Sequence, residues 1–310
     1  MNLFATIVQM IKILNGIYIY DKVISMKIGD FEFLIGADPE CFIIEKATGK
    51  LVSAHGMLPG DKDNPYPVKH GAIQVDGMAA EFNIDPAATE DEFVRNVKDV
   101  LDQIRLHLGV KYDLVFIPTA HFGKALIDAQ PMEAKILGCD PDFNAYTHKQ
   151  NPMPNVETPY RTGAGHIHIG WTNGVDISNK QHLGMCEHLI RNLDHYSMWT
   201  MLHDEDTTRR MLYGKAGAYR PKSYGVEYRT PSNFWLSDEK YMRQMYRTVM
   251  FTILKAVGGS AYVKPKEDCL MVYQQRVDYV FNNRDFDSYW DEDDLSSQIR
   301  TINMWGIKNV

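Results

Sequence analysis

A repeated spacing of polar residues is the feature that most constrains this 310-residue chain. In GAGHIHIGW, residues 163–171, two histidines flank one isoleucine. Residues at i and i+2 share a face of a β-strand but not of a helix, so His166 and His168 predict a strand with one polar face. Three other short stretches repeat the spacing: Asp38 with Glu40, Glu81 with Asn83, and Glu227 with Arg229.

A single strand of this kind can simply be half exposed, because an antiparallel sheet with one solvated face alternates polar and apolar residues. Four such strands are more informative. Their polar members are mostly carboxylates, imidazoles and a guanidinium, and glycines flank them. Glycine lets a ligand or another chain segment approach the backbone closely. We therefore expect the four polar faces to contribute to a common site.

Three long helices are expected from apolar periodicity and capping residues. Thr89 and Glu92 form a capping box for a helix near 90–108, which Gly109 would end. The other two are expected near 179–202, capped by Ser178 with Gln181, and near 238–257, capped by Ser237.

Short strands are expected between these helices, and the order of elements is mixed rather than a regular βαβ alternation. That order favours an α+β fold with a largely antiparallel sheet. The basic, glycine-containing segment 208–225 is expected to form a loop. The expected strands lie at 31–36, 41–45, 112–117 and 226–230, with two more inside 72–84.

Length and composition narrow the class of protein. A chain of 310 residues with 45% hydrophobic residues can form one large or two modest domains. A net charge of -7 does not favour nucleic acid as a partner. Four cysteines without a CxxC pair favour a reduced, cytoplasmic protein without a zinc ribbon or disulfide framework. After the first 25 residues, no stretch of the sequence approaches the roughly 18 consecutive apolar residues of a membrane span.

The first 25 residues are apolar but lack the basic start and small-residue cleavage site of an export signal. Met26 offers a second plausible translation start. We expect residues 1–25 to be a loose extension or a start artefact, and residues 26–310 to form a single catalytic domain.

Carboxylates gathered on one face of a sheet repel one another unless a cation lies among them. Several carboxylates with one or two imidazoles suit Mg²⁺ or Mn²⁺, which are hard ions that prefer oxygen ligands. Zinc is the alternative, because two histidines and a carboxylate would form a catalytic zinc centre. The surplus of carboxylates favours the harder ion.

Basic residues concentrate just before the strand that bears Glu227. A solvated charged surface would explain such a run, but guanidinium groups beside divalent cations are also what a transferring phosphoryl group needs. The chain has no GxxxxGK[ST] loop, so side chains and metal ions would have to hold phosphate. The candidate phosphate-binding residues are Arg209, Arg210, Lys215, Arg220, Lys222 and Arg229.

Three strings, GADPE, GAGHIHIGW and YGKAGAYRPKSYGVEYRTPSNFW, carry a family resemblance over roughly residues 33–236. They resemble the phage-type COOH–NH2 ligases (amidoligase type 2) of the glutamine synthetase and glutamate–cysteine ligase superfamily. The resemblance implies a curved antiparallel sheet with helices on its convex side and with ATP and two or three Mg²⁺ or Mn²⁺ ions on its concave face. The implied metal ligands are Asp38, where a glutamate is more usual, Glu40, Glu81, one of His166 and His168, and Glu227.

The resemblance also implies a mechanism. A carboxylate attacks the γ-phosphoryl group of ATP to form an acyl phosphate, which an amine then attacks. Arg229 and Arg220 are expected to stabilise the phosphoryl charge, with Arg209 or Arg210 assisting. Asp76 is a candidate base for the amine, although Asp-Gly is also a common turn pair.

Two alternatives stay open at this point. One is a zinc hydrolase that uses the HIH strand, and the other is a non-catalytic binding module on the same fold. The acid and amine could be small molecules or peptides, and the oligomeric state is open. We expect neither nucleic acid nor membrane as a partner, and a cytoplasmic location, in a bacterial host if the gene is carried by a phage.

Overall fold

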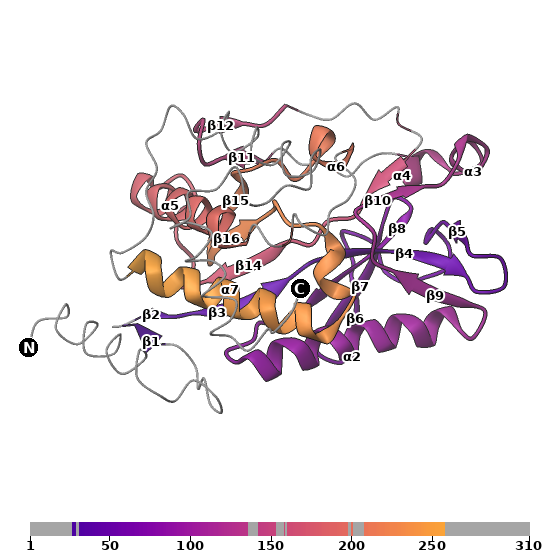
Figure 1. The fold of residues 1–310 in the computed structure, drawn as a ribbon, viewed down its shortest axis with the longest axis horizontal. Helices are drawn as coiled ribbons and strands as arrows, with labels where there is room; N and C mark the ends of the chain where they lie inside the picture. The colour runs from indigo at the N-terminus through magenta and orange to yellow at the C-terminus, as the bar shows by residue number, and fades with distance from the viewer. Residues whose placement is uncertain are drawn as a thin grey trace, which may run out of the picture.

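The structure is a computed structural model that describes residues 27–28, 31–135, 142–152, 158, 160–197, 200 and 208–257 (Figure 1). The predicted extension at residues 1–25 and the segment after residue 257 lie outside the described residues. Division into domains therefore stays a prediction.

Two antiparallel sheets form a curled half-barrel, and every pairing between described strands is antiparallel. This confirms the predicted α+β class. The first sheet has the order β12 (Lys149–Gln150), β11 (Phe143–Asn144), β15 (Ala218–Lys222), β16 (Gly225–Tyr228), β14 (Ile167–Gly170) and β3 (Leu34–Ala37).

The second sheet has the order β5 (Lys50–Val52), β4 (Glu40–Glu45), β8 (Ala79–Ile84), β7 (Gly71–Asp76) and β6 (Tyr66–Val68), with β9 (Tyr112–Val115) also paired to β4. Two further pairs join β1 (Lys27–Ile28) to β2 (Phe31–Glu32), and β10 (Thr119–His121) to β13 (Tyr160–Thr162).

One chain segment connects the two sheets. Strand β3 ends at Ala37 and β4 begins at Glu40, so only Asp38 and Pro39 separate them. The amide of Glu40 donates to the carbonyl of Ala164 at 2.8 Å, which keeps this segment beside the chain that leads into β14. The two polar faces therefore meet where the sheets join.

Three long helices cover one side of the sheets: α2 (Glu90–Leu108), α5 (Lys180–Tyr196) and α7 (Glu239–Val257) (Figure 1). Helix α2 packs on β7, β8 and β9, α5 packs on β15 and β16, and α7 packs against both helices. The shorter helices are α3 (Lys124–Asp128), α4 (Met132–Lys135), α6 (Thr208–Leu212) and the 3-10 helix η2 (Asn233–Leu236).

Helix α2 forms where the sequence predicts it. The hydroxyl of Thr89 accepts the Glu92 amide, and Gly109 ends the helix with a positive φ of 70°. Its spaced apolar residues are buried against the second sheet. The capping box and periodicity alone were therefore sufficient to place this element.

Three local predictions were wrong. Helix α5 is capped by Asn179, whose side chain accepts the amides of Gln181 and His182, rather than by Ser178. Asp238 accepts the Lys240 amide and takes the capping role expected of Ser237. Segment 208–225 is not a loop, because it contains α6, β15 and the turn into β16.

Alternation in β14 and β16 separates the core from the site. Ile167, Ile169, Val226 and Tyr228 are buried in the same hydrophobic cluster as Leu193 of α5. The residues that alternate with them along each strand, such as His168 and Glu227, must point to the opposite face of the sheet. Burial of the apolar residues thus fixes which face carries the polar residues.

Two further predictions can be compared with the described residues. None of the helices described in the structure is long and apolar enough to cross a bilayer. Cys41 and Cys186 are buried and unpaired, and burial raises the pKa of each thiol to about 12. Neither thiol is therefore poised as a nucleophile.

Candidate active site

Strand register brings the four predicted polar pairs together. His168 of β14 lies opposite Gly36 of β3 on one side and Glu227 of β16 on the other. In the second sheet, Glu40 of β4 lies opposite Glu81 of β8. Because the segment between β3 and β4 joins these two neighbourhoods, their polar residues line one continuous surface.

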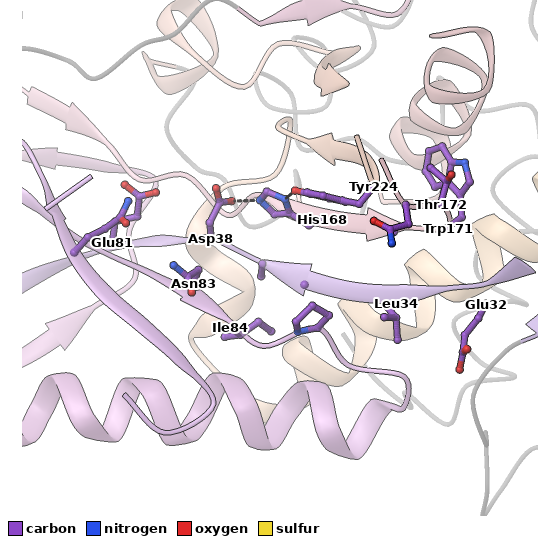
Figure 2. A pocket seen from close by; sticks show the side chains of 16 residues that line it. Glu32, Leu34, Asp38, Glu81, Asn83, Ile84, His168, Trp171, Thr172 and Tyr224 are labelled. Atoms are coloured by element: carbon purple, nitrogen blue, oxygen red, sulfur yellow. Dashed lines mark hydrogen bonds and ion pairs between the residues drawn. The ribbon is translucent and has the colours of Figure 1, made fainter. Parts of the chain in front are cut away.

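The first group of possible metal ligands, here called the mixed cluster, consists of Asp38, His168 and Glu227. Nε2 of His168 lies 2.8 Å from Oδ1 of Asp38 (Figure 2). Cationic side chains reach Glu227 from its own strand and the next: Arg229 pairs with it directly, Lys222 lies at 2.8 Å and Arg220 at 3.6 Å.

These contacts shift the ionisation of the mixed cluster. Burial opposes charge on Asp38, but the neighbouring imidazoles of His168 and His166 hold its pKa well below its ordinary value. Burial also opposes protonation of His168, yet Asp38 and Glu227 raise its pKa. Burial and the charge of Asp38 raise the pKa of Glu227. The group therefore contains ion pairs formed by its own side chains.

His166 lies next to two members of the mixed cluster, Asp38 and Glu227. Its Nδ1 is 3.4 Å from Asp38 and 3.6 Å from Glu227, and its ring centroid is 5.9 Å from that of Tyr213. Burial and the nearby Arg229 lower the pKa of this imidazole to about 3, so it is neutral at neutral pH. Its Nε2 has no hydrogen-bond partner among the described residues.

The second group, here called the acidic cluster, consists of Glu40, Asp76 and Glu81. Oε2 of Glu40 accepts the Ala164 amide at 2.9 Å. Burial and the charge of Asp76 raise the pKa of Glu40 to about 7. Burial, with the charges of the neighbouring carboxylates, raises the pKa of Glu81 well above its ordinary value.

Both clusters fit a divalent cation. In each, one ligand atom from every member lies within 4.8 Å of the others. In the mixed cluster, Oε2 of Glu227 is buried without a hydrogen bond among the described residues, although Lys222 pairs with it by charge. Three carboxylates in the acidic cluster, and two with an imidazole in the mixed cluster, match the oxygen-rich sets that Mg²⁺ and Mn²⁺ prefer.

A cavity of about 740 Å³ opens beside the clusters. Figure 2 shows Asp38 and His168 facing each other in it, with Glu81 on one side and Leu34 and Glu32 farther along the first sheet. The cavity thus reaches from both clusters to an exposed edge. Its other described lining residues are Gly36, Ala37, Gln74, Asn83, Ile84, Pro86, Gly170, Trp171, Thr172, Asn173 and Tyr224.

The predicted phosphate-binding residues fall into two sets. Arg220, Lys222 and Arg229 surround Glu227. Arg209 instead donates to the carbonyls of Gly163, Thr230 and Pro231 and is fully buried.

These contacts correct the phosphate prediction for Arg209, because its three guanidinium nitrogens are bonded to backbone. Arg210 of α6 is also buried, and it donates to the Gly214 carbonyl at 3.0 Å. Lys215 is partly exposed at the start of the β15–β16 hairpin, and its phosphate role stays a prediction.

Three residues next to the site were not predicted. Tyr224, in the turn between β15 and β16, hydrogen-bonds Nδ1 of His168 through its hydroxyl. Asp142 lies 3.3 Å from Nε of Arg229, and the ring of Tyr213 lies under the Arg229 guanidinium. The YGVEYRT string contains Tyr224, but only the hairpin register could have shown that it reaches the histidine strand.

Comparison with known families adds an independent observation. Residues 151–258 match the family model described as phage phiEco32-like COOH.NH2 ligase-type 2. This segment of the chain is therefore similar to the COOH–NH2 ligase type 2 family. The match confirms the resemblance predicted from the sequence and indicates a ligase enzyme. No curated protein matches the chain.

The segment that matches the ligase family contributes only part of the candidate site. It includes His166, His168, Glu227 and the arginines of the hairpin. Asp38 and the whole acidic cluster lie before residue 151, outside the match. The family match therefore does not reach the acidic cluster, which the β4–β8 pairing and the Glu40–Ala164 backbone hydrogen bond bring beside the matched segment.

Proposed function

We propose that this COOH–NH2 ligase is ATP-dependent, that it uses Mg²⁺ or Mn²⁺, and that it forms an amide bond through an acyl phosphate. The observation that carries the proposal is the pairing of two oxygen-rich clusters with a guanidinium group at Glu227. With divalent ions bound in the clusters, such a set could neutralise a polyphosphate and still leave arginine hydrogen bonds for the transferring phosphoryl group.

We assign the divalent ions to the two clusters. Asp38, His168 and Glu227 would hold one ion, and Glu40, Asp76 and Glu81 another. Bound there, the ions would neutralise phosphate charge and orient the nucleotide. His168 rather than His166 is our proposed imidazole ligand, because it is grouped with the carboxylates of the mixed cluster and its Nε2 lies 2.8 Å from Oδ1 of Asp38.

The chain's own residues would act on the phosphoryl group as follows. The substrate carboxylate attacks the γ-phosphorus, the bond to the bridging oxygen breaks, and ADP leaves. Arg229 is held between Glu227 and Asp142 and over Tyr213, so its fork is preorganised for the charge on the phosphoryl oxygens. Arg220, opposite Glu227 on β15, would assist from the next strand.

The second half-reaction needs a proton acceptor. The amine attacks the acyl carbon, loses a proton and expels phosphate. Asp76 remains a proposed base, and its place in the acidic cluster with Glu40 and Glu81 supports metal binding equally. A reduced cytoplasmic setting, rich in ATP and free Mg²⁺, would suit this chemistry.

The test is a screen of acid and amine pairs for ADP release by the full chain, with and without Mg²⁺ or Mn²⁺. We expect release that depends on metal and on both substrates, and a product whose mass is that of the two joined with loss of water. Tightly bound zinc with hydrolysis of an amide and no ADP would instead establish the zinc hydrolase. Nucleotide binding with no ADP from any pair would favour the non-catalytic module.

A further inference from the structure

We infer that the 740 Å³ cavity is the binding site of the amine substrate, and that this substrate is an organic primary amine without an anionic group, larger than ammonia. The inference rests on the proposed ligase function, since it assigns one of the two substrates of that reaction. It is carried by the charge, shape and lining of the cavity, which differ from those of the basic neighbourhood around Glu227.

Charge is the first argument. The described residues that line the cavity include no lysine or arginine. Of their three carboxylates, Asp38 and Glu81 belong to the proposed ion sites, and Glu32 lies apart from both clusters. The cations near the site gather around Glu227 instead, where Arg229, Lys222 and Arg220 pair with it. An anionic group in the cavity would meet no lysine or arginine among these residues, whereas an ammonium group would be attracted to the Glu32 carboxylate.

This distribution of charge separates the place where phosphates would bind from the place where the amine would bind. Phosphates are drawn to the cationic side chains around Glu227, and a neutral or cationic molecule is drawn to the cavity. Asp38 and His168 line the cavity and also belong to the mixed cluster. A ligand in the cavity can therefore bring its amine up to the proposed site of phosphoryl transfer without occupying the basic neighbourhood.

The residues that line the cavity indicate what kind of molecular body carries the amine group. Leu34, Ile84 and Pro86 offer apolar surface, and Trp171 and Tyr224 offer rings that can contact an alkyl chain or a cation. Amide and hydroxyl groups from four further lining residues can bond a peptide or hydroxyl group: Gln74, Asn83, Thr172 and Asn173.

Size separates an organic amine from ammonia. A cavity of about 740 Å³ lies within the range of sites that enclose drug-sized molecules. Ammonia would leave its apolar walls without a partner. An amine on an alkyl or peptide body would cover them and keep water from the acyl phosphate.

The experiment compares probes of equal length and opposite charge on the full chain with Mg²⁺. Ligand-observed NMR titration would measure binding of cadaverine (1,5-diaminopentane), glutarate and ammonium. We expect cadaverine to bind and neither glutarate nor ammonium to compete with it at equal concentration. Equal binding of glutarate, or none of cadaverine, would overturn the inference.

Substitutions of Leu34, which lines the cavity, test whether cadaverine binds there. Leu34 is 38% exposed and lines the cavity, so Leu34→Arg should weaken cadaverine binding at least about 10-fold, because it adds a like charge. Leu34→Glu should strengthen it. Leu106→Arg, on the exposed side of α2, is the matched control and should leave cadaverine binding unchanged. Thermal melts would confirm that each variant folds.

A non-hydrolysable ATP analogue distinguishes the two proposals. If Leu34→Arg disrupts cadaverine binding but not analogue binding, the cavity is separate from the nucleotide site, as inferred. If Leu34→Glu abolishes analogue binding and leaves cadaverine unaffected, the cavity holds the nucleotide and the inference is wrong. If the unmodified chain binds cadaverine but no analogue with any metal, the ligase proposal fails while the cation preference of the cavity stands.

Discussion

The mixed cluster and the acidic cluster meet at the segment between β3 and β4 but balance their charge in different ways. In the mixed cluster, Lys222 and Arg229 reach Glu227, and His168 reaches Asp38. In the acidic cluster every member is a carboxylate, and burial with mutual repulsion raises the pKa of Glu40 and Glu81. The acidic cluster therefore depends more strongly on an added cation.

This difference has a consequence for ion binding. An ion that enters the acidic cluster replaces protons held by the carboxylates. An ion that enters the mixed cluster must instead displace a side-chain partner, and Lys222 is the partner on the otherwise unbonded Oε2 of Glu227. We therefore expect ion affinity to depend on pH differently at the two sites. We also expect an ion at the mixed cluster to bind at the cost of the Lys222–Glu227 ion pair.

Glu227→Gln should have the largest effect. It removes the negative charge that holds Arg229 and contributes to the mixed cluster, so metal-dependent ATP turnover should fall by about 100-fold or more. Phosphate release measures turnover, and circular dichroism checks the fold. Turnover near the original rate would remove Glu227 from the site.

Arg229→Lys should lower turnover more than it weakens nucleotide binding, by about 10- to 100-fold in kcat, because a point charge cannot replace the guanidinium fork. Titration with a non-hydrolysable ATP analogue separates binding from turnover. An equal loss of both would assign Arg229 to ground-state contact with the nucleotide.

Arg209→Lys makes the same substitution as Arg229→Lys, but at an arginine that bonds backbone carbonyls. Because Arg209 bonds three carbonyls, its replacement should lower the free energy of unfolding by about 2 to 4 kcal/mol. Analogue binding by the folded protein should stay unchanged. Denaturant titration measures the loss, and a stable variant with weakened analogue binding would return Arg209 to the phosphate-binding set.

The acidic cluster should make stability depend on pH when metal is absent. Glu40 has a pKa of about 7 in the folded chain against 4.5 without the fold. Between these values the folded state holds a proton that the unfolded chain has lost, so stability should fall as pH rises, by on the order of 3 kcal/mol.

Denaturant titration of the metal-free chain at pH 4.5 and pH 7.5 tests this expectation. Glu40→Gln should reduce the dependence and leave the part carried by Glu81, and saturating Mg²⁺ or Mn²⁺ should also reduce it. Glu133→Gln, at an exposed position of α4, is the control. A profile that Glu40→Gln leaves unaltered would show that Glu40 does not carry the effect.

Tyr224→Phe should have the smallest effect. It removes only the hydroxyl that hydrogen-bonds His168, so turnover should fall by about 10-fold or less, with a matching loss of metal affinity. Steady-state kinetics across a Mn²⁺ titration would measure both. A larger fall in turnover with unchanged Mn²⁺ affinity would indicate direct contact between Tyr224 and substrate.

Alternation was sufficient to predict which polar residues would meet. A strand with one buried face has a fixed register, since a slip of one residue exposes its apolar side. The sequence thus placed His168, Glu227 and Glu81 on one surface before their strand order was known. The position of Asp76 beside Glu40 and Glu81 could not be read from its turn, because it depends on how β7 pairs with β8.

Other contacts depend on chain crossings that local patterns do not encode. Tyr224 is 56 residues from His168, and Asp142 is 87 residues from Arg229. Arginine type alone does not distinguish a phosphate ligand from a donor to backbone carbonyls, which is why the sequence could not show the three carbonyl contacts of Arg209. At the start of α5, Ser178 and Asn179 are both good capping residues, and only the backbone direction selects Asn179.

The Asp38–Pro39–Glu40 junction restricts how the length of this chain can vary. Asp38 and Glu40 are alternate residues of one extended segment, so their backbone positions are only about 7 Å apart. Insertion of one residue at Pro39 would turn one carboxylate toward the helices and deprive a cluster of a member. Homologous chains can therefore differ in length in the outer hairpins, but this tripeptide should keep its spacing wherever both clusters are used.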